Sequence, residues 1–376
     1  MIYLDYAASS PPFPEVAAKL SEVSLNVFGN PGSLHEAGTE ARKILQNSRA
    51  VLARKINVRP EEIFFTSGGT EANNWAVRVG RAVPGKNHIV CFSAEHSSVL
   101  EPVRRMEKKG YSVTYLPPDR NGVLSPAAAE AALRPDTAML CAQAVNNETG
   151  VMQDVDTLAQ IARKHRVRFF CDAVQSFGHT SQNLHRADLI SLSAHKLGGP
   201  RGIGCLVIRQ PLIPSPMILG GGQEFGYRSG TENIPGIAGF ALAAELSCSH
   251  PEHEQSRLKA LRILLEQRLR NICPDLEIAG EHAPRSSILS CRFPGISAEE
   301  MVVRLDAAGI CASPGAACAA RSSKPSHVLL SMGYSPEEAS QFVRFSPGRN
   351  TSEEDIHRTA NVIAECIQKR STCHGK

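Results

Sequence analysis

The lysine at position 196 lies between two apolar runs, one beginning after Asp188 and one ending at Ile208, with a Gly-Gly-Pro turn before the second run. Burial at the mouth of such a strand pair would lower the pKa of the Lys196 amine and make the amine nucleophilic. A lysine of this kind can form a Schiff base with a carbonyl group. The simpler interpretation of these residues alone is a surface lysine at the start of a hairpin turn.

Three further positions offer chemistry that matches a Schiff-base lysine. Ser67-Gly-Gly-Thr70 follows an apolar run and could direct backbone N–H groups and a hydroxyl at an anion, although such glycines often serve only a turn. Asp172 ends another apolar run, where a carboxylate needs a hydrogen-bonding or cationic partner. A pyridinium N–H would be one such partner, and a helix cap is the alternative. With His96 able to stack on a ring, the set fits pyridoxal phosphate.

Cys318 is the cysteine best suited to chemistry. It lies in a run of small residues, with Arg321 and Lys324 nearby. Exposure and positive neighbours lower the pKa of a thiol and make it nucleophilic, whereas a structural loop cysteine would fit the same residues. The chain has 11 cysteines, but they form neither a disulfide framework nor a zinc pattern.

The elements that would position these residues repeat as strand, polar loop and helix from about residue 62. Short apolar runs alternating with helices favour an α/β layer with a largely parallel sheet. Ligands of such sheets bind beyond the carboxyl ends of the strands. Polar residues follow the expected strands at Ser67 to Thr70, His96, Asn147, Asp172, Gln175, Ser193 and His195. Strand ends are often polar simply because loops are, but several such clusters on one edge favour a pocket.

The length of 376 residues exceeds what one hydrophobic core usually supports, so two domains are expected. The sequence predicts a large α/β domain over residues 14–250 and a smaller α+β domain from residues 1–13 plus 251–376. The net charge is +4, from 41 basic and 37 acidic residues, with no concentrated basic face to bind nucleic acid. We find no apolar run of the roughly 20 residues that a membrane helix needs, and no signal sequence, so a cytoplasmic protein is expected.

Taken together, the motifs resemble the NifS/IscS-type cysteine desulfurases, and the related selenocysteine lyases, of the fold-type I pyridoxal-phosphate enzymes in the class-V aminotransferase family. The match extends over nearly the whole chain, from Ile2 to Arg349. Its motifs are Thr66-Ser-Gly-Gly-Thr-Glu71, Glu95-His96, Asn146-Asn-Glu-Thr-Gly150, Asp172-Ala-Val-Gln175, Ser193-Ala-His-Lys196, Arg228-Ser-Gly-Thr-Glu-Asn233 and Gly315-Ala-Ala-Cys318. The resemblance implies a large domain with a mostly parallel seven-stranded sheet and a smaller α+β domain.

The resemblance also implies residue roles around pyridoxal 5′-phosphate. Lys196 would hold the cofactor covalently and move protons, His96 would stack on the ring and assist, and Asp172 would pair with the ring nitrogen. Arg344 would clamp the substrate carboxylate, because guanidinium binds carboxylate in a bidentate way. Gln175 would bond the ring hydroxyl, and Asn147 would help to orient the ring and the substrate. The phosphate would be held by Gly69, Thr70, Ser193 and His195, with Thr231 reaching in from the partner of a homodimer.

For Cys318 the implied role is attack on the substrate sulfur, which leaves a persulfide on the enzyme and releases alanine. No resident metal is implied, although Cys318 could serve transiently as an iron–sulfur ligand. The sulfur would pass to an acceptor protein, such as an iron–sulfur scaffold or a thiolation protein. The chain stops soon after its last expected helix, which puts delivery to a scaffold in doubt.

Two other activities remain open from the sequence. The same site in a selenocysteine lyase would release selenium from L-selenocysteine, and Gly315-Ala-Ala-Cys318 followed by Pro325 also resembles those enzymes. The third possibility is a desulfurase-like sulfur carrier or partner-binding module with little turnover. The intact lysine, aspartate, histidine and cysteine argue against this third interpretation.

Overall fold

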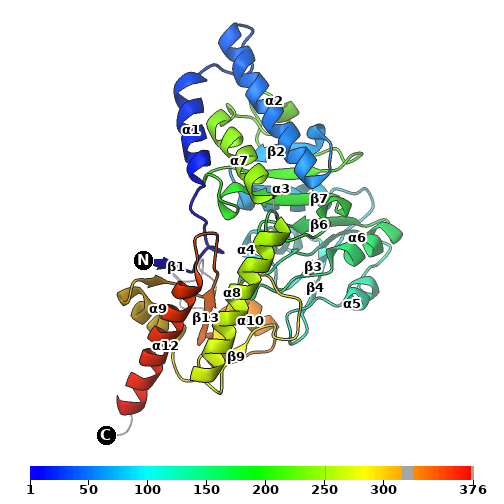
Figure 1. Ribbon diagram of the computed structural model, residues 1–376. Coiled ribbons are helices and arrows are strands. Elements are labelled where there is room, and N and C mark those ends of the chain that lie inside the picture. Colours follow the sequence, from blue (N-terminus) through cyan, green and yellow to red (C-terminus); the bar gives the residue numbers. More distant parts are fainter. Residues whose placement is uncertain (250, 316–324, 374–376) are drawn as a thin grey trace.

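A computed structural model describes residues 1–249, 251–315 and 325–373 of the chain. Within these residues, a central sheet of seven strands lies between two layers of helices (Figure 1). Its strands, in spatial order, are β2 (Ile63–Thr66), β8 (Gly204–Ile208), β7 (Leu189–Ser193), β6 (Arg168–Asp172), β5 (Thr137–Cys141), β3 (His88–Phe92) and β4 (Ser112–Leu116). Strand β8 is antiparallel to both of its neighbours, and the other pairs are parallel. The expected mostly parallel, seven-stranded sheet is confirmed.

The strands are buried on both faces, and their side chains alternate between two hydrophobic clusters. In β3, Val90 and Phe92 belong to one cluster, while Ile89 and Cys91 belong to the other. The first cluster is covered by α1 (Pro14–Asn26), α2 (Glu36–Ile56), α5 (Pro126–Ala131), α6 (Val155–Lys164) and α7 (Ile234–Ser247). Helices α3 (Gly69–Gly80) and α4 (Ser97–Glu107) cover the second.

Capping fixes several helix ends. At the start of α6, Asp154 Oδ1 accepts a hydrogen bond from the Thr157 N–H group at 3.0 Å, which satisfies one of the N–H groups left open at a helix start. Asn57 ends α2 in the left-handed region, with φ of 59°. Single-turn 3₁₀ helices also occur, namely η1 (Pro60–Glu62), η2 (Leu184–Arg186), η3 (Ala194–Lys196) and η4 (Glu224–Gly226).

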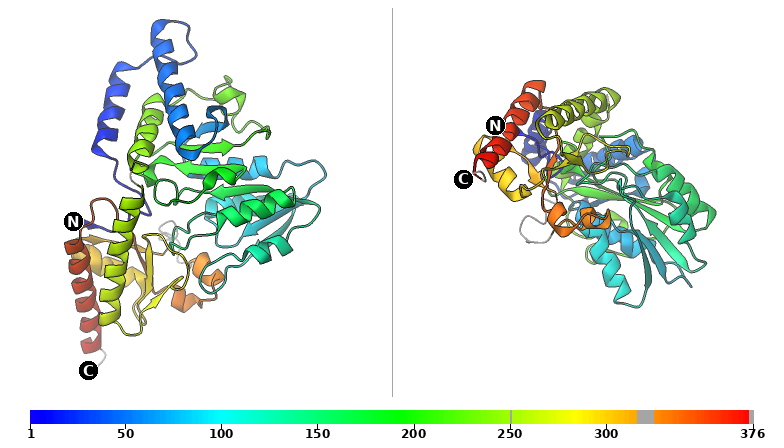
Figure 2. Two further views of the ribbon diagram at one scale, coloured as in Figure 1. Left: turned by 45° about the vertical axis from the view of Figure 1, so that its right-hand side comes forward. Right: turned by 90° about the horizontal axis from the view of Figure 1, so that it is seen from below.

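A second sheet has its own hydrophobic cluster. The strands of this sheet, in spatial order, are β12 (Ser313–Pro314), β13 (Phe342–Phe345), β10 (Leu289–Arg292) and β9 (Glu277–Ile278). Helices α8 (Pro251–Ile272) and α12 (Glu353–Cys373) lie side by side next to it, in yellow-green and red, in both figures, with α9 (Ala298–Ala307) near α12 (Figures 1 and 2). The short helices α10 (His327–Ser331) and α11 (Pro336–Ala339) instead contribute residues to the first cluster of the central sheet.

The N-terminal segment leads from a third, two-stranded sheet, which shares the hydrophobic cluster of the second sheet, to the helices of the central sheet. Strand β1 (Ile2–Tyr3) pairs in parallel with β11 (Ile310–Cys311), far along the sequence. From there the dark-blue chain passes to α1 beside the central sheet (Figure 1). We call residues 5–13, which make this passage, the N-terminal strap.

Most elements expected from the sequence are present, with two informative differences. The sequence over residues 138–145 and 168–175 is typical of strands throughout, but the regular strands end at Cys141 and Asp172. Beyond these points the chain turns, and Val145 forms an isolated antiparallel bridge with Met152. The apolar pattern continues past the regular strands because these turns remain buried. Among the helices of the described residues, none is both long enough and apolar enough to cross a membrane.

Candidate active site

The segments that follow five strands of the central sheet meet around one cavity of about 390 Å³, the front cavity. Of the residues expected in the site, the lining includes Gly69, Thr70, His96, Asn147, Asp172, Gln175, Ser193, His195, Lys196 and Arg344. The convergence of polar clusters at the carboxyl edge of the sheet is therefore observed.

Lys196 ends η3 and reaches into the front cavity. Its Nζ donates hydrogen bonds to the backbone oxygens of Ala7 at 2.5 Å and Ala8 at 3.0 Å, both in the N-terminal strap. Strands β7 and β8 do pair in antiparallel fashion, as the hairpin interpretation required. The lysine between them is nevertheless half-buried in a cavity wall and is not an ordinary surface lysine.

Asp172 is buried at the end of β6 with 6% of its surface exposed. Its Oδ1 accepts a hydrogen bond from the Val174 N–H group at 3.0 Å, and its Oδ2 accepts one from Asn73 Nδ2 at 2.7 Å. The chain after Asp172 continues in turns until η2, so the alternative role as a helix cap is wrong. The carboxylate is held by two donors while it lines the cavity.

The same amide that binds Asp172 is connected to His96. Asn73 Nδ2 donates to Ser98 Oγ at 2.8 Å, and Ser98 Oγ lies 2.7 Å from His96 Nδ1. Because Nδ1 also accepts from the Ser98 N–H group at 3.1 Å, the proton of a neutral ring is on Nε2. Burial lowers the pKa of His96, although Asp172 opposes this shift, so the ring is neutral at neutral pH.

One end of the cavity is suited to an anion. Gly69 begins α3, so the open N–H groups of a helix start lie beside it. A Cβ atom at Gly69 would lie 2.9 Å from Val174 Cγ2, which explains why a glycine stands there. His195 Nδ1 and Arg201 Nε lie 3.2 Å and 3.3 Å from Ser9 Oγ of the strap. Burial, together with the charges of Lys196 and Arg201, lowers the pKa of His195 to about 4.

The other end of the cavity holds Arg344, which has 1% of its surface exposed. Its Nη1 donates to the Asn147 backbone oxygen at 2.9 Å, and its Nη2 lies 2.7 Å from Asp5 Oδ1. Arg344 Nε has no hydrogen-bond partner among the residues that the structure describes. A guanidinium that lines the cavity is suited to a small carboxylate.

One expected residue, Thr231, is not brought into the front cavity. Thr231 is exposed and lies away from the lining. Its loop is anchored elsewhere, through a buried ion pair of 2.6 Å between Glu224 and Arg49 and through Arg228, which pairs with Glu71 at 2.8 Å. Cys318 lies outside the described residues, as do Arg321 and Lys324.

Sequence reasoning missed several residues of the site. Asn73, Ser98, Gln143, Glu148 and His327 line the front cavity. Glu148 belongs to a motif noted in the sequence, and its burial raises its pKa. Its Oε2 accepts a hydrogen bond from Ser326 Oγ at 2.5 Å. Asn73 stands on a helix whose pattern shows only a buried face, so nothing in the sequence distinguishes its amide from a packing residue.

The donor set fits pyridoxal phosphate. A phosphate would find a helix start and the hydroxyl and imidazole side chains at one end of the front cavity. A ring nitrogen bearing a proton would find the Asp172 carboxylate, and a carbonyl group would find the Lys196 amine. Gly69 leaves space that a Cβ atom would fill, so the cradle is shaped as well as charged.

The chain was compared with known proteins. The aminotransferase class-V model matches residues 2–359. The cysteine desulfurase IscS of Dictyoglomus turgidum is 38% identical, covering 99% of this chain and 95% of the relative. The putative cysteine desulfurase IscS 1 of Bacillus subtilis is 36% identical, covering 98% and 99%. A solved NifS-like protein superposes with a TM-score of 0.91 at 32% identity, covering 98% of this chain and 99% of that one.

A further solved structure, SspA in complex with cysteine, superposes with a TM-score of 0.81 at 32% identity and covers 92% of this chain and 98% of SspA. The similarity to these proteins spans the central sheet, the second sheet and the strap, since nearly the whole chain is aligned. The chain therefore belongs to the aminotransferase class-V family, among the cysteine desulfurases of the IscS and NifS type.

Proposed function

We propose that the protein is a pyridoxal-phosphate-dependent cysteine desulfurase. It removes sulfur from L-cysteine, forms L-alanine and passes the sulfur to an acceptor protein. The observation that carries this proposal is the meeting of Lys196, Asp172, His96 and Arg344 around one cavity of about 390 Å³. The full-length similarity to cysteine desulfurases, and to a structure solved with cysteine, favours L-cysteine as the substrate.

The position of each residue in the front cavity indicates its role in the reaction. Pyridoxal phosphate, when bound, supplies an electron sink for charge that develops at the substrate Cα. Asp172 would balance a positive charge on the ring nitrogen, and Arg344, which also lines the cavity, would hold the substrate carboxylate. Lys196 Nζ would be the base that moves a proton at Cα, and neutral His96, with its proton on Nε2, would donate on its own side of the cavity.

The sulfur step is assigned to Cys318. Its thiolate would attack the substrate sulfur, forming an S–S bond while the C–S bond breaks. The electron pair of the broken bond stays with the carbon, which takes up a proton to give alanine. The sulfur remains on Cys318 as a persulfide, from which an acceptor thiol can remove it. Gly315, the last described residue before this cysteine, is next to Glu148 on the cavity wall, which supports the assignment: a Cβ atom there would lie 3.6 Å from Glu148 Oε2.

The test measures alanine and sulfide from L-cysteine, and alanine and selenide from L-selenocysteine, with Lys196→Ala and Cys318→Ala as variants. We expect alanine from L-cysteine with the wild-type protein and none with Lys196→Ala. Cys318→Ala should lose the protein-bound persulfide, which mass spectrometry detects. A wild-type protein that releases alanine only from L-selenocysteine would be a selenocysteine lyase and would overturn the proposal.

We also propose a homodimer in which Thr231 of one subunit completes the phosphate end of the other. The exposed position of Thr231 away from its own cavity supports this arrangement, as do the exposed Leu219 (84%) and Phe225 (51%) in the same loop. Mixing Lys196→Ala subunits with Thr231→Ala subunits provides the test. In a mixed dimer, the site that keeps Lys196 receives an intact Thr231 from the other chain. Activity should therefore exceed that of either variant alone, and its absence in verified mixed dimers would contradict the arrangement.

We keep the predicted domain boundaries as part of this proposal, with residues 14–250 forming the large domain and residues 1–13 plus 251–376 the small one. The separate hydrophobic cluster around β9, β10 and β13 supports the division. The N-terminal strap would then connect the two domains beside the cofactor lysine.

A further inference from the structure

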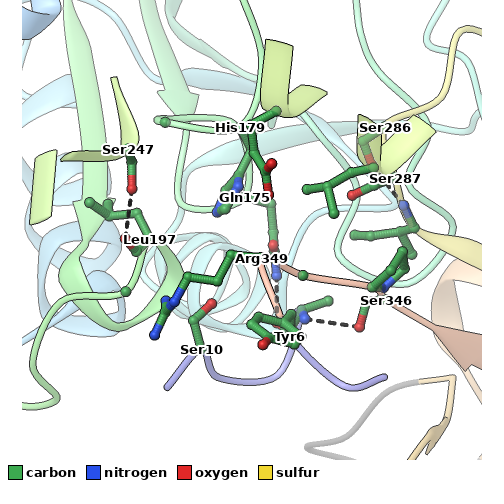
Figure 3. A pocket seen from close by; sticks show the side chains of 18 of the residues that line it. Tyr6, Ser10, Gln175, His179, Leu197, Ser247, Ser286, Ser287, Ser346 and Arg349 are labelled. Atoms are coloured by element: carbon green, nitrogen blue, oxygen red, sulfur yellow. Dashed lines mark hydrogen bonds between the residues drawn. The ribbon is translucent and has the colours of Figure 1, made fainter. Parts of the chain in front are cut away.

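Behind the front cavity lies a second one of about 320 Å³, the rear cavity, which shares Ala7 and Gln175 with the first as a common wall. Figure 3 shows Ser10, His179 and Ser247 around it. Gln175 Nε2 donates to the Ala7 backbone oxygen at 2.7 Å, so this wall is fixed by hydrogen bonds. None of the three residues Ser10, His179 and Ser247 lines the front cavity.

Residues 195–198 around Lys196 have four consecutive backbone oxygens that need hydrogen-bond donors from other parts of the chain. Each accepts a hydrogen bond from the strap or from the wall of the rear cavity. The donors, in chain order of the oxygens, are Ser10 N–H for His195 (2.9 Å), Ser10 Oγ and His179 Nε2 for Lys196 (2.7 and 2.8 Å), Ser247 Oγ for Leu197 (2.8 Å) and Phe13 N–H for Gly198 (2.9 Å).

Among these four oxygens, only that of Lys196 accepts two of these bonds. Both donors are side chains, one from the strap and one from the segment after β6. Burial lowers the pKa of His179, so its ring is neutral at neutral pH. Because a carbonyl oxygen only accepts, the single ring proton lies on Nε2 and is donated to Lys196.

A lysine that alternates between a covalent bond to a cofactor and proton transfer must move its Nζ while its Cα stays in place. We propose that His179 and Ser10 are positioning residues for Lys196, and that they fix its backbone from the rear cavity so that Nζ meets the cofactor. This inference rests on the proposed role of Lys196. It assigns a function to two residues that touch neither substrate nor cofactor.

The test measures binding of two probes to cofactor-free protein. Pyridoxal phosphate bonds to Lys196, whereas pyridoxamine phosphate has the same ring and phosphate but cannot form this bond. We expect His179→Ala and Ser10→Ala each to weaken binding of pyridoxal phosphate about 3- to 10-fold, the range for one lost hydrogen bond. Binding of pyridoxamine phosphate should change less than about twofold, because the ring and phosphate contacts remain.

Two further variants make the result specific. His179→Gln places an amide N–H near the position of Nε2 and should restore most of the affinity for pyridoxal phosphate. Ser247→Ala removes a bond of the same type and length from the neighbouring Leu197 oxygen, in the same rear cavity, and is the matched control. It should leave the affinity for both probes near that of wild type.

The outcomes separate this inference from the proposed function. If wild-type protein binds no pyridoxal phosphate, the proposed function fails. If wild-type protein binds it and the His179 and Ser10 variants match Ser247→Ala, only the positioning role is overturned. An equal loss of affinity for pyridoxal phosphate and pyridoxamine phosphate would also overturn the positioning role, because it would indicate that the whole front cavity is disturbed.

Discussion

Asn73 donates a hydrogen bond to Asp172 Oδ2 at 2.7 Å, and the same amide nitrogen bonds Ser98 Oγ, which in turn contacts His96. One buried amide therefore binds the Asp172 carboxylate directly and, through Ser98, the histidine on the cavity wall. Asn73 is only 1% exposed, so this amide is buried together with the two groups that it binds. The pair shows that the acid–base groups of the site depend on a helix residue that carries no charge.

Replacing this amide should weaken catalysis more than binding of the substrate. In Asn73→Ala, Asp172 loses a donor to a charged group, which is worth about 1.5–3 kcal/mol, and kcat for alanine formation should fall about 10-fold or more. The measurement is steady-state kinetics with L-cysteine at saturating cofactor. Asn87→Ala, an exposed asparagine distant from the site, is the control and should keep wild-type kinetics. An unchanged kcat in Asn73→Ala would show that the amide is only structural.

The ion pair between Asp5 and Arg344 predicts an effect on substrate affinity. Arg344 is almost fully buried, and Asp5 orients its Nη2. In Asp5→Ala the guanidinium loses this restraint, so we expect KM for L-cysteine to rise about 10-fold, with a smaller change in kcat. Asp5→Asn keeps an acceptor oxygen and should cause a smaller rise. A fall in kcat at unchanged KM would contradict the assignment of Arg344 to the substrate carboxylate.

The buried pair of Arg49 and Glu224 predicts a large effect on stability. Each side chain is 2% exposed, and Glu224 Oε2 also accepts from the Phe65 N–H group at 2.9 Å. Glu224→Gln leaves the Arg49 charge buried without its partner, which should lower the free energy of unfolding by about 3–5 kcal/mol. Urea denaturation measures the change. Glu22→Gln, which breaks the exposed pair with Lys19, is the matched control and should cost less than about 1 kcal/mol.

His195 predicts a dependence of stability on pH in the cofactor-free protein. Its pKa is about 4 in the folded protein, below the value of 6.5 for an unperturbed histidine. Between these values the unfolded chain binds more protons, so this group lowers the free energy of unfolding as the pH falls from 6.5 to 4, by up to about 3 kcal/mol. The contribution is fully present above pH 6.5.

The test of this prediction compares urea denaturation of wild type and His195→Asn across that pH range. Buried Glu95 and Glu148 have raised pKa values, so they stabilise the folded protein as the pH falls and oppose the effect of His195. The contribution of His195 is therefore taken from the difference in the free energy of unfolding between wild type and His195→Asn. We expect the loss of stability on acidification to be smaller in His195→Asn. Parallel curves would show that His195 does not contribute.

The part of the site that the sequence predicted follows one rule. Lys196, Asp172 and His96 each follow an apolar strand, and the ends of parallel strands must share an edge. The residues that hold them could not be found in this way. Asn73 and Ser98 lie on helices where amides and hydroxyls are common, and Asp5 meets Arg344 across 339 positions of sequence. The first contacts depend on how α3 and α4 pack on the central sheet, and the last on how the strap meets the second sheet, which no local pattern records.

The pairing of β1 with β11 has a consequence for how the protein is made. During synthesis the chain emerges from its N-terminus, so Ile2 must wait for Ile310 before it can form its strand. Until then the strap is fixed only at its α1 end, and Ser10, which donates to the carbonyl groups of His195 and Lys196, lies on its unanchored side. The central sheet can therefore assemble early, while the strap beside its lysine is fixed at both ends only after Cys311 has been translated.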